Sequence, residues 1–328
     1  MKYPRMNNVL TFSEKEDGSF LAKNNLNDKR WIISKECKMF LEQLDGRTNP
    51  YMILRSVPKN EVRRILEQYE KRGLLFKYRL RILNIFSYMY AVLIPNFTER
   101  DKRRAQFLKD VLIYSWLPVL IWGIWLSMDI WMDPHAINVH GYDYLTGFIG
   151  GTLLGVVFHE AAHGIVGLAT GAKVLEFGVM IQYFLPGAYV LMNTEDVKRM
   201  DRAKIMAAGI EMNIWLGGVF LGLSALFPGH FYMFVVAAVA NLILAAFNVT
   251  FVEGFDGMQL ISELIGIDDF VARAKEVTRS KKKRRKIRKY KGNGEAFITA
   301  CYLIRLFQVV LPIAIVLTIV NMWGGFFR

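Results

Sequence analysis

The residues of this chain best suited to chemistry are two histidines and a glutamate in the run His159-Glu160-Ala161-Ala162-His163. Helix positions i and i+4 share one face, so both imidazoles can reach a single metal ion. Zinc (Zn2+) is the metal that this pattern favours. Glu160 stands beside the first ligand, where a carboxylate can take a proton from a water on the metal. The motif therefore predicts metal-assisted hydrolysis.

The segment around this motif is apolar enough to cross a bilayer. It covers residues 145–170 and contains no other charged side chain. Ionisable groups are costly in hydrocarbon, so each needs a partner or a task. A chance motif packed by helix neighbours is the alternative, and the apolar surroundings make it the weaker interpretation.

The composition indicates a membrane protein that also has polar parts. Hydrophobic residues make up 53% of the 328 residues, yet 22% are charged and the charges cluster. A span needs about 20 apolar residues, and five segments qualify: residues 111–132, 145–170, 205–227, 231–252 and 297–323. Cys37 and Cys301 have no cysteine neighbours, which indicates neither a disulfide framework nor a thiolate zinc site.

The positive charge is distributed as in a membrane protein with a cytosolic amino terminus. The net charge is +13, and basic runs precede the first span, follow the second and fill residues 273–291, whereas the loop 133–144 has no Lys or Arg. We therefore expect a multi-pass protein of the bacterial plasma membrane. The basic cytosolic segment is expected to meet anionic lipid, and nucleic acid is not an expected partner. The first 18 residues lack an apolar core, so no cleavable signal is expected.

Residues 1–78 are predicted to form a small cytosolic α+β domain. Strands are expected near residues 9–13, 19–22 and 30–33, with the first two joined at Asp17-Gly18. Ser34 can cap a first helix, Asn49-Pro50 can start a short second one, and residues 60–72 form a third. Three strands followed by three helices suggest a winged-helix-like unit.

This arrangement resembles the PqqD-like domain that recognises leader peptides of ribosomally made, modified peptides. The likeness rests on residues 44–48, Leu-Asp-Gly-Arg-Thr, and on the closing segment 69–76. An exposed strand edge containing Trp31 and Ile32, beside the helix 60–72, would form the peptide groove. A winged helix can also bind DNA, and the basic residues of the last helix leave that alternative open.

Residues 79–110 are predicted to be an interfacial helix and a basic connector, and residues 111–328 a transmembrane metalloprotease domain. The remaining histidines, His135, His140 and His230, fall in predicted outer loops, which favours a carboxylate as the third protein ligand. Asp256 follows the fourth span, and Gly257 lets the backbone turn there. Glu253 is a rival ligand.

The membrane part resembles the site-2 protease family over about residues 145–262, its expected catalytic core. His159, Glu160 and His163 match the first family motif, and Asn248 with Asp256-Gly257 matches the second, N-x-x-P-x-P-x-L-D-G. Phe251 and Glu253 stand where the family has prolines, and Phe255 replaces the leucine. The resemblance implies three zinc ligands, His159, His163 and Asp256, with Glu160 as the catalytic base.

Two asparagines are further candidates. Residues 208–213, Ala-Gly-Ile-Glu-Met-Asn, resemble the family's G-P-x-x-N segment. This suggests that Asn213 contacts the substrate or the oxyanion, and Asn248 of the second motif is assigned to substrate binding with it. Residues 172–192 look like the family's membrane-embedded sheet, whose edge would hold a substrate extended. An ordinary hairpin without a substrate role is the alternative.

The expected fold is thus a mainly α-helical polytopic membrane protein with about five spans, a small membrane-embedded β region and an amino-terminal α+β domain. The expected function is zinc-dependent hydrolysis of a peptide bond in a ribosomally made precursor, alongside a peptide-modifying enzyme and an exporter. One alternative is regulated intramembrane proteolysis of a membrane-bound signalling or transcription regulator. Another is a non-hydrolytic peptide sensor or immunity protein.

Overall fold

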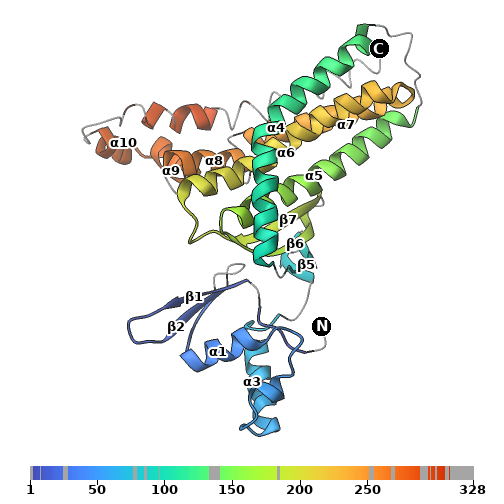
Figure 1. The fold of residues 1–328 in the computed structure, drawn as a ribbon. Helices are drawn as coiled ribbons and strands as arrows, with labels where there is room; N and C mark the ends of the chain where they lie inside the picture. Colours follow the sequence, from blue (N-terminus) through green and yellow to red (C-terminus); the bar gives the residue numbers. More distant parts are fainter. Residues whose placement is uncertain are drawn as a thin grey trace. The chain divides into compact units, whose positions relative to one another are not determined.

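A computed structural model provides the structure of the chain (Figure 1). It describes residues 3–7, 9–24, 29–76, 80–84, 87–95, 97–132, 141–182, 185–250, 255–266, 270–288, 295, 297–299, 301–306 and 310. The chain divides into two compact units, one formed by Met1–Phe97 with Ala172–Glu195 and the other by Thr98–Gly171 with Asp196–Arg328. An insertion between two membrane helices thus belongs to the amino-terminal unit.

The first unit begins with a three-stranded antiparallel sheet. Its strands are β1 (Leu10–Glu14), β2 (Phe20–Asn24) and β3 (Arg30–Ile33), in the order β1-β2-β3. The β1–β2 turn is stabilised because Asp17 accepts a hydrogen bond from the amide of Ser19 at 2.9 Å, while Gly18 takes the positive φ of 76° that other residues avoid. The predicted strands and this turn are confirmed.

Three helices follow: α1 (Lys35–Gln43), α2 (Pro50–Ile53) and α3 (Lys59–Lys71). Ser34 caps α1 by accepting from the amide of Cys37, and Asn49 caps α2, as the sequence predicts. Buried side chains from both layers form one core: Leu10, Phe20, Ala22, Ile33, Phe40, Leu41, Leu44, Leu74 and Leu75. The order of three strands and three helices is confirmed, and the winged-helix assignment stays a prediction.

The segment after this core forms strands, so the prediction of an interfacial helix over residues 79–97 is wrong. β4 (Leu80–Asn84) and β5 (Ser87–Leu93) join β6 (Lys173–Gln182) and β7 (Leu185–Asn193) in an antiparallel sheet of order β4-β5-β6-β7. Along β5, Ser87, Met89 and Ala91 are buried, while the residues between them are exposed. This alternation has the period of a strand, and pairing with β6 satisfies its backbone. The predicted strands within residues 172–192 are confirmed.

The second unit is helical. Its described helices are α4 (Glu99–Met132), α5 (Asp143–Ala169), α6 (Arg199–Leu226), the short 3-10 turn η2 (Pro228–His230), α7 (Phe231–Val249), α8 (Asp256–Ile265), α9 (Phe270–Arg279) and α10 (Lys281–Arg288). Four segments of the described part are long and apolar enough to cross a membrane: Glu99–Met128, Asp143–Ala169, Arg199–Leu226 and Pro228–Val249. The fifth predicted span, residues 297–323, lies mostly outside the described residues.

Small residues let the membrane helices approach closely. α5, α6 and α7 run side by side (Figure 1), and α6 also packs against α4 and α8. A Cβ built on Gly151 of α5 would lie 2.5 Å from the Cα of Ala237 in α7, so only glycine fits there. Asn241 of α7 donates to the carbonyl of Gly151 at 3.0 Å. This contact fixes α5, which carries the histidine pair, against α7.

Candidate metal centre

Three side chains meet where α5 approaches the start of α8. His159 and His163 lie one turn apart on the buried face of α5, and Asp256 is the first residue of α8. Nε2 of His159 lies 2.8 Å from Oδ2 of Asp256, and Nε2 of His163 lies 3.1 Å from the same oxygen and 3.1 Å from Nε2 of His159. Within the described residues these three form the group able to hold a metal ion.

The other ring nitrogen of each histidine faces α6. Nδ1 of His163 lies 2.6 Å from the carbonyl oxygen of Ile205, which can only accept, so Nδ1 carries the proton and donates. Nε2 of His163 is then unprotonated, and its lone pair points toward Asp256. Nδ1 of His159 lies 3.0 Å from the side-chain amide of Asn213. α6 therefore sets the orientation of both imidazole rings.

The donor set fits zinc. Tetrahedral zinc with ligands at about 2.0–2.1 Å holds those ligands about 3.3 Å apart, close to the separations found here. The Oδ1 atom of Asn213 is buried without a hydrogen-bond partner. Exchanging the amide oxygen and nitrogen of Asn213 lets Oδ1 accept the Nδ1 proton of His159. Both Nε2 lone pairs then point at one place, as two histidine ligands of a metal require.

One wall of this place is a glycine of α6. A Cβ built on Gly209 would lie 2.5 Å from Nε2 of His159 and 2.6 Å from Nε2 of His163. Ordinary van der Waals contacts are about 1 Å longer. The side chain of any other residue at position 209 would therefore occupy the space that the two Nε2 atoms need.

Asp256, the third member of this group, is placed by the way α8 begins. A Cβ on Gly257 would lie 2.6 Å from the carbonyl oxygens of Asn248 and Val249, so only glycine lets α8 start against the end of α7. This explains the Asp-Gly pair physically. Oδ2 of Asp256 then lies 2.8 Å from Nε2 of His159 and 3.1 Å from Nε2 of His163, where a carboxylate can complete the set of metal ligands.

The far end of α8 is held by two arginines at the start of α6. Nε of Arg202 lies 2.8 Å from Oε1 of Glu263, and both side chains are about three-quarters buried. Arg199 donates to the carbonyl of Leu264 at 3.1 Å. α6 thus contacts both histidines and the helix that carries the aspartate.

The residues predicted to bind substrate lie in different places. Asn213 is 1% exposed and faces His159, while Asn248 donates to the carbonyl of Leu244 in its own helix at 3.0 Å. Trp31 packs partly against the amino-terminal core, whereas Ile32 is 62% exposed on β3. A substrate role for each of these four residues stays a prediction.

The remaining candidates for the metal or the chemistry divide into described and undescribed residues. Glu160 follows His159 on α5 and is partly exposed. His230 lies 3.4 Å from Asp143, in a different pair from the metal ligands. Glu253, His135 and His140 lie outside the described residues.

Sequence reasoning missed the contributions of α6 other than Asn213. The carbonyl of Ile205 and the missing side chain of Gly209 carry no motif of their own, because any residue has a carbonyl and glycines are frequent in spans. The ion pair of Arg202 with Glu263 joins residues 61 positions apart, so no local motif indicates it. A glycine four residues before Asn213 was the one available signal, since positions 209 and 213 share a helix face.

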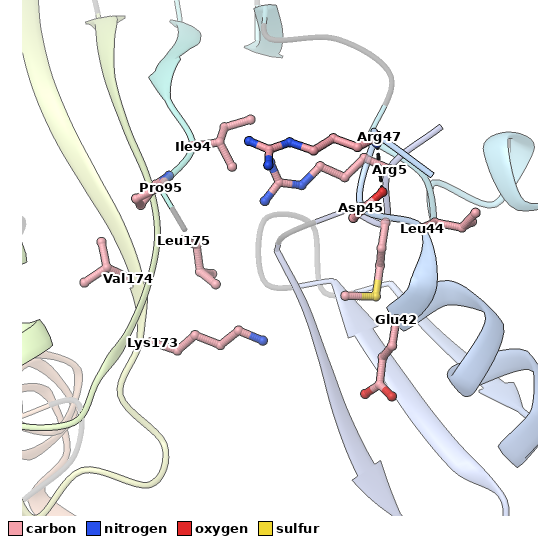
Figure 2. Close-up of a pocket in the computed structure, with 11 residues that line it drawn as sticks. Arg5, Glu42, Leu44, Asp45, Arg47, Ile94, Pro95, Lys173, Val174 and Leu175 are labelled. Atoms are coloured by element: carbon pink, nitrogen blue, oxygen red, sulfur yellow. Dashed lines mark hydrogen bonds between the residues drawn. The ribbon is translucent and has the colours of Figure 1, made fainter. Parts of the chain in front are cut away.

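The first unit contains a separate cleft with a volume of about 340 Å³. Arg5, Arg47 and Lys173 point their cationic ends into it, and Ile94 and Pro95 line one side (Figure 2). None of the three metal ligands lines this cleft. It is therefore not part of the metal centre.

Comparison with known proteins identifies the fold around the histidines. A family model described as Peptidase family M50 matches residues 147–230, which include most of α5 and all of α6. Residues 147–230 form an M50 peptidase domain. This domain is that of a membrane-embedded metallopeptidase of the site-2 protease family, in agreement with the apolar helices. No curated protein and no solved structure matches the chain. Asp256 lies beyond the matched residues, so its place in the site rests on the geometry alone.

Proposed function

We propose that this chain is a zinc-dependent endopeptidase that hydrolyses a peptide bond in a peptide or membrane-protein substrate at the bilayer. The observation that carries the proposal is the convergence of His159, His163 and Asp256 from two helices within a unit that contains an M50 domain. The buried partners of both Nδ1 atoms support it, because they leave two lone pairs at the site. A peptide sensor without catalysis would not need this arrangement.

The chain's own residues supply positioning and proton transfer. His159, His163 and Asp256 would hold the zinc ion, which when bound supplies Lewis-acid activation of a water and polarisation of the scissile carbonyl. Glu160 accepts the proton that this water loses as its oxygen attacks the carbonyl carbon. Glu160 then returns the proton to the amine nitrogen as the C–N bond breaks. Ile205 and Asn213 keep the rings fixed throughout, because their contacts involve the nitrogens that face away from the metal.

For the substrate we propose a ribosomally made precursor peptide, recognised by the amino-terminal domain. β3 is an edge strand of its sheet, and Ile32 on it is 62% exposed. An added peptide strand can pair with such an edge while an exposed apolar side chain provides a contact. A modifying enzyme and an exporter acting on the same precursor would complete the pathway that this substrate class implies.

The competing use of the amino-terminal domain is DNA binding, which would make the chain a regulator that cleaves a membrane-bound signalling partner. α3 argues against this use. Its sequence, KNEVRRILEQYEK, has four basic and three acidic side chains, and Arg63 lies 3.1 Å from Glu67. DNA binding relies on phosphate contacts from a strongly basic face. The near-neutral α3 fits a peptide partner better.

The proposed peptidase activity is tested with the full chain in detergent micelles and a pooled synthetic peptide library, with new termini identified by mass spectrometry. Glu160→Gln keeps size and polarity but cannot accept the proton, so we expect zinc to stay bound and cleavage to fall by about 100-fold or more. A chelator should abolish cleavage by the wild type, and added zinc should restore it. Cleavage by Glu160→Gln at the wild-type rate, or zinc-independent cleavage, would contradict the proposal.

The recognition step is tested separately with the same library. Ile32→Asp places a charge on the β3 edge and should slow cleavage at low peptide concentration while leaving the rate at saturation unchanged. Met39→Asp is the matched control, because Met39 is likewise exposed, at 52%, but belongs to helix α1 and not to the strand. Equal effects of the two variants would reject the edge as the binding surface. Tight, salt-sensitive binding of duplex DNA by the wild type would favour the regulator.

A further inference from the structure

The first membrane helix carries a group of arginines that the peptidase site does not use. A hollow on α4 is lined by Arg100, Arg103, Arg104, Phe107 and Leu108. Positions 100, 103, 104, 107 and 108 recur at helical spacing, so the five side chains form one stripe. The hollow thus combines three guanidinium groups with two apolar side chains.

The same stripe continues along the apolar part of α4. Val111 is 41% exposed, Tyr114 78%, Ile121 59% and Trp125 66%. The opposite face of the helix is buried, with Ala105 and Leu112 in the core and Gly123 against Gly218 of α6. Because Glu99–Met128 is long and apolar enough to span a bilayer, this exposed stripe faces lipid.

The positive charge at the start of the stripe is little neutralised by the protein. Among the described residues Arg100 and Arg103 form no ion pair, and Arg104 approaches Asp101 only at 4.0 Å. Neighbouring acidic groups are engaged elsewhere, since Lys102 binds Glu99 at 2.6 Å and Lys109 binds Asp110 at 3.3 Å. Three guanidinium groups are therefore available to an external anion.

We propose that this stripe binds an anionic phospholipid, with the phosphate headgroup on Arg100, Arg103 and Arg104 and an acyl chain along Phe107, Val111 and Tyr114. Guanidinium groups match phosphate oxygens in pairs of hydrogen bonds. The apolar side chains that directly follow can contact an acyl chain. The hollow therefore matches both the charged headgroup and the apolar tail of a phospholipid. A free phosphate ion would use only the arginines. The proposal rests on the membrane helix and is independent of the peptidase activity.

The other basic helix differs and provides a control. α10 has the sequence KKKRRKIR, with no apolar stripe following its charges. Arg284 donates to the carbonyls of Val277 and Thr278, and Lys283 pairs with Glu276. Lys281, Lys282 and Lys286 are exposed. Replacing these three lysines removes the same charge as replacing the three arginines of α4.

The experiment measures phosphatidylglycerol retained by the full chain in neutral detergent, by native mass spectrometry, with phosphatidylcholine as the reference lipid. Each basic side chain near an anionic headgroup strengthens binding roughly fivefold, so the triple variant Arg100→Gln, Arg103→Gln, Arg104→Gln should weaken it roughly 100-fold. The triple variant Lys281→Gln, Lys282→Gln, Lys286→Gln should change it less than fivefold, because the contact with anionic lipid predicted for this segment relies on the charged surface of a bilayer, which neutral detergent lacks. Zinc content of both variants should equal that of the wild type, which shows that the fold is intact.

Any of four outcomes would overturn the proposal. Unchanged retention in the α4 variant would exclude the arginines, and equal loss in the α10 variant would reduce the effect to general charge attraction. Displacement of the lipid by excess inorganic phosphate would show that the site recognises phosphate without the acyl chain. If the α4 variant loses zinc, Arg103→Ser alone decides the question, because it removes one exposed charge and should weaken retention roughly fivefold. Wild-type retention by Arg103→Ser would then reject the site.

Discussion

Replacing Gly209 by alanine tests whether α6 shapes the metal site. The new Cβ would lie 2.5 Å from Nε2 of His159 and 2.6 Å from Nε2 of His163, so the rings must retreat by about 1 Å. They have little freedom to do so, because their Nδ1 atoms are hydrogen-bonded to Asn213 and Ile205. Overpacking of this kind costs about 1–3 kcal/mol. If this strain falls on the metal-bound state, zinc affinity falls roughly 5- to 150-fold.

Zinc affinity is the suitable readout, measured by competition with a chromophoric chelator in detergent. Thermal stability is less suitable because alanine favours a helix over glycine by about 1 kcal/mol, which offsets part of the strain. Gly150→Ala is the matched control, since it lies on α5 and its Cβ would meet no heavy atom within 4 Å. Wild-type zinc affinity in Gly209→Ala, or an equal loss in Gly150→Ala, would refute the geometry of the site.

Substitutions at three further contacts examine the rest of the metal centre. Asp256→Ala should lower zinc content in purified protein while the helical circular dichroism is kept, and zinc content at the wild-type level would remove Asp256 from the ligand set. Asn213→Leu removes the contact to Nδ1 of His159 and should weaken zinc binding about 10- to 100-fold, whereas Asn213→Asp, which can still accept the ring proton, should retain most of it. Arg202→Glu and Glu263→Arg should each reduce zinc affinity through movement of α8. The double exchange should restore it, and a double variant no better than the singles would show that the ion pair does not position Asp256.

The proposed zinc ligands could be named from the sequence because their chemistry resides in side chains at fixed spacing. His159 and His163 needed only the helical period to be placed together. Predicting Asp256 also required the order and direction of the spans, because this residue comes from a different span and must lie at the same depth as the histidines. The resemblance to a family motif directed attention to it. The described geometry brings all three together as expected, with their ligand atoms within 4.8 Å of one another.

The β4–β5 hairpin could not be predicted in the same way. Residues 79–97 contain arginines beside apolar side chains, a mixture common in interfacial helices, and the alternation in β5 is only a few residues long. What decides the structure is a partner more than 80 positions away: Ser87 pairs with Gln182 and Tyr90 with Val179. The sequence of a strand carries little information about a partner strand that is distant in the chain, so such a strand is difficult to predict from its own residues.

The contacts of α6 with the histidines could not be predicted from the sequence either. Its sequence contains one residue that matches a family motif, Asn213, for which substrate contact was the natural expectation. In the structure the carbonyl of Ile205 and the side-chain amide of Asn213 contact the histidines of α5. Gly209, which has no side chain, leaves room for both imidazole rings. A backbone carbonyl or a missing side chain affects the histidines only because α6 packs against α5. The candidate ligands of this metal centre can therefore be predicted from a motif, whereas the helix that orients them is identified only from the packing in the structure.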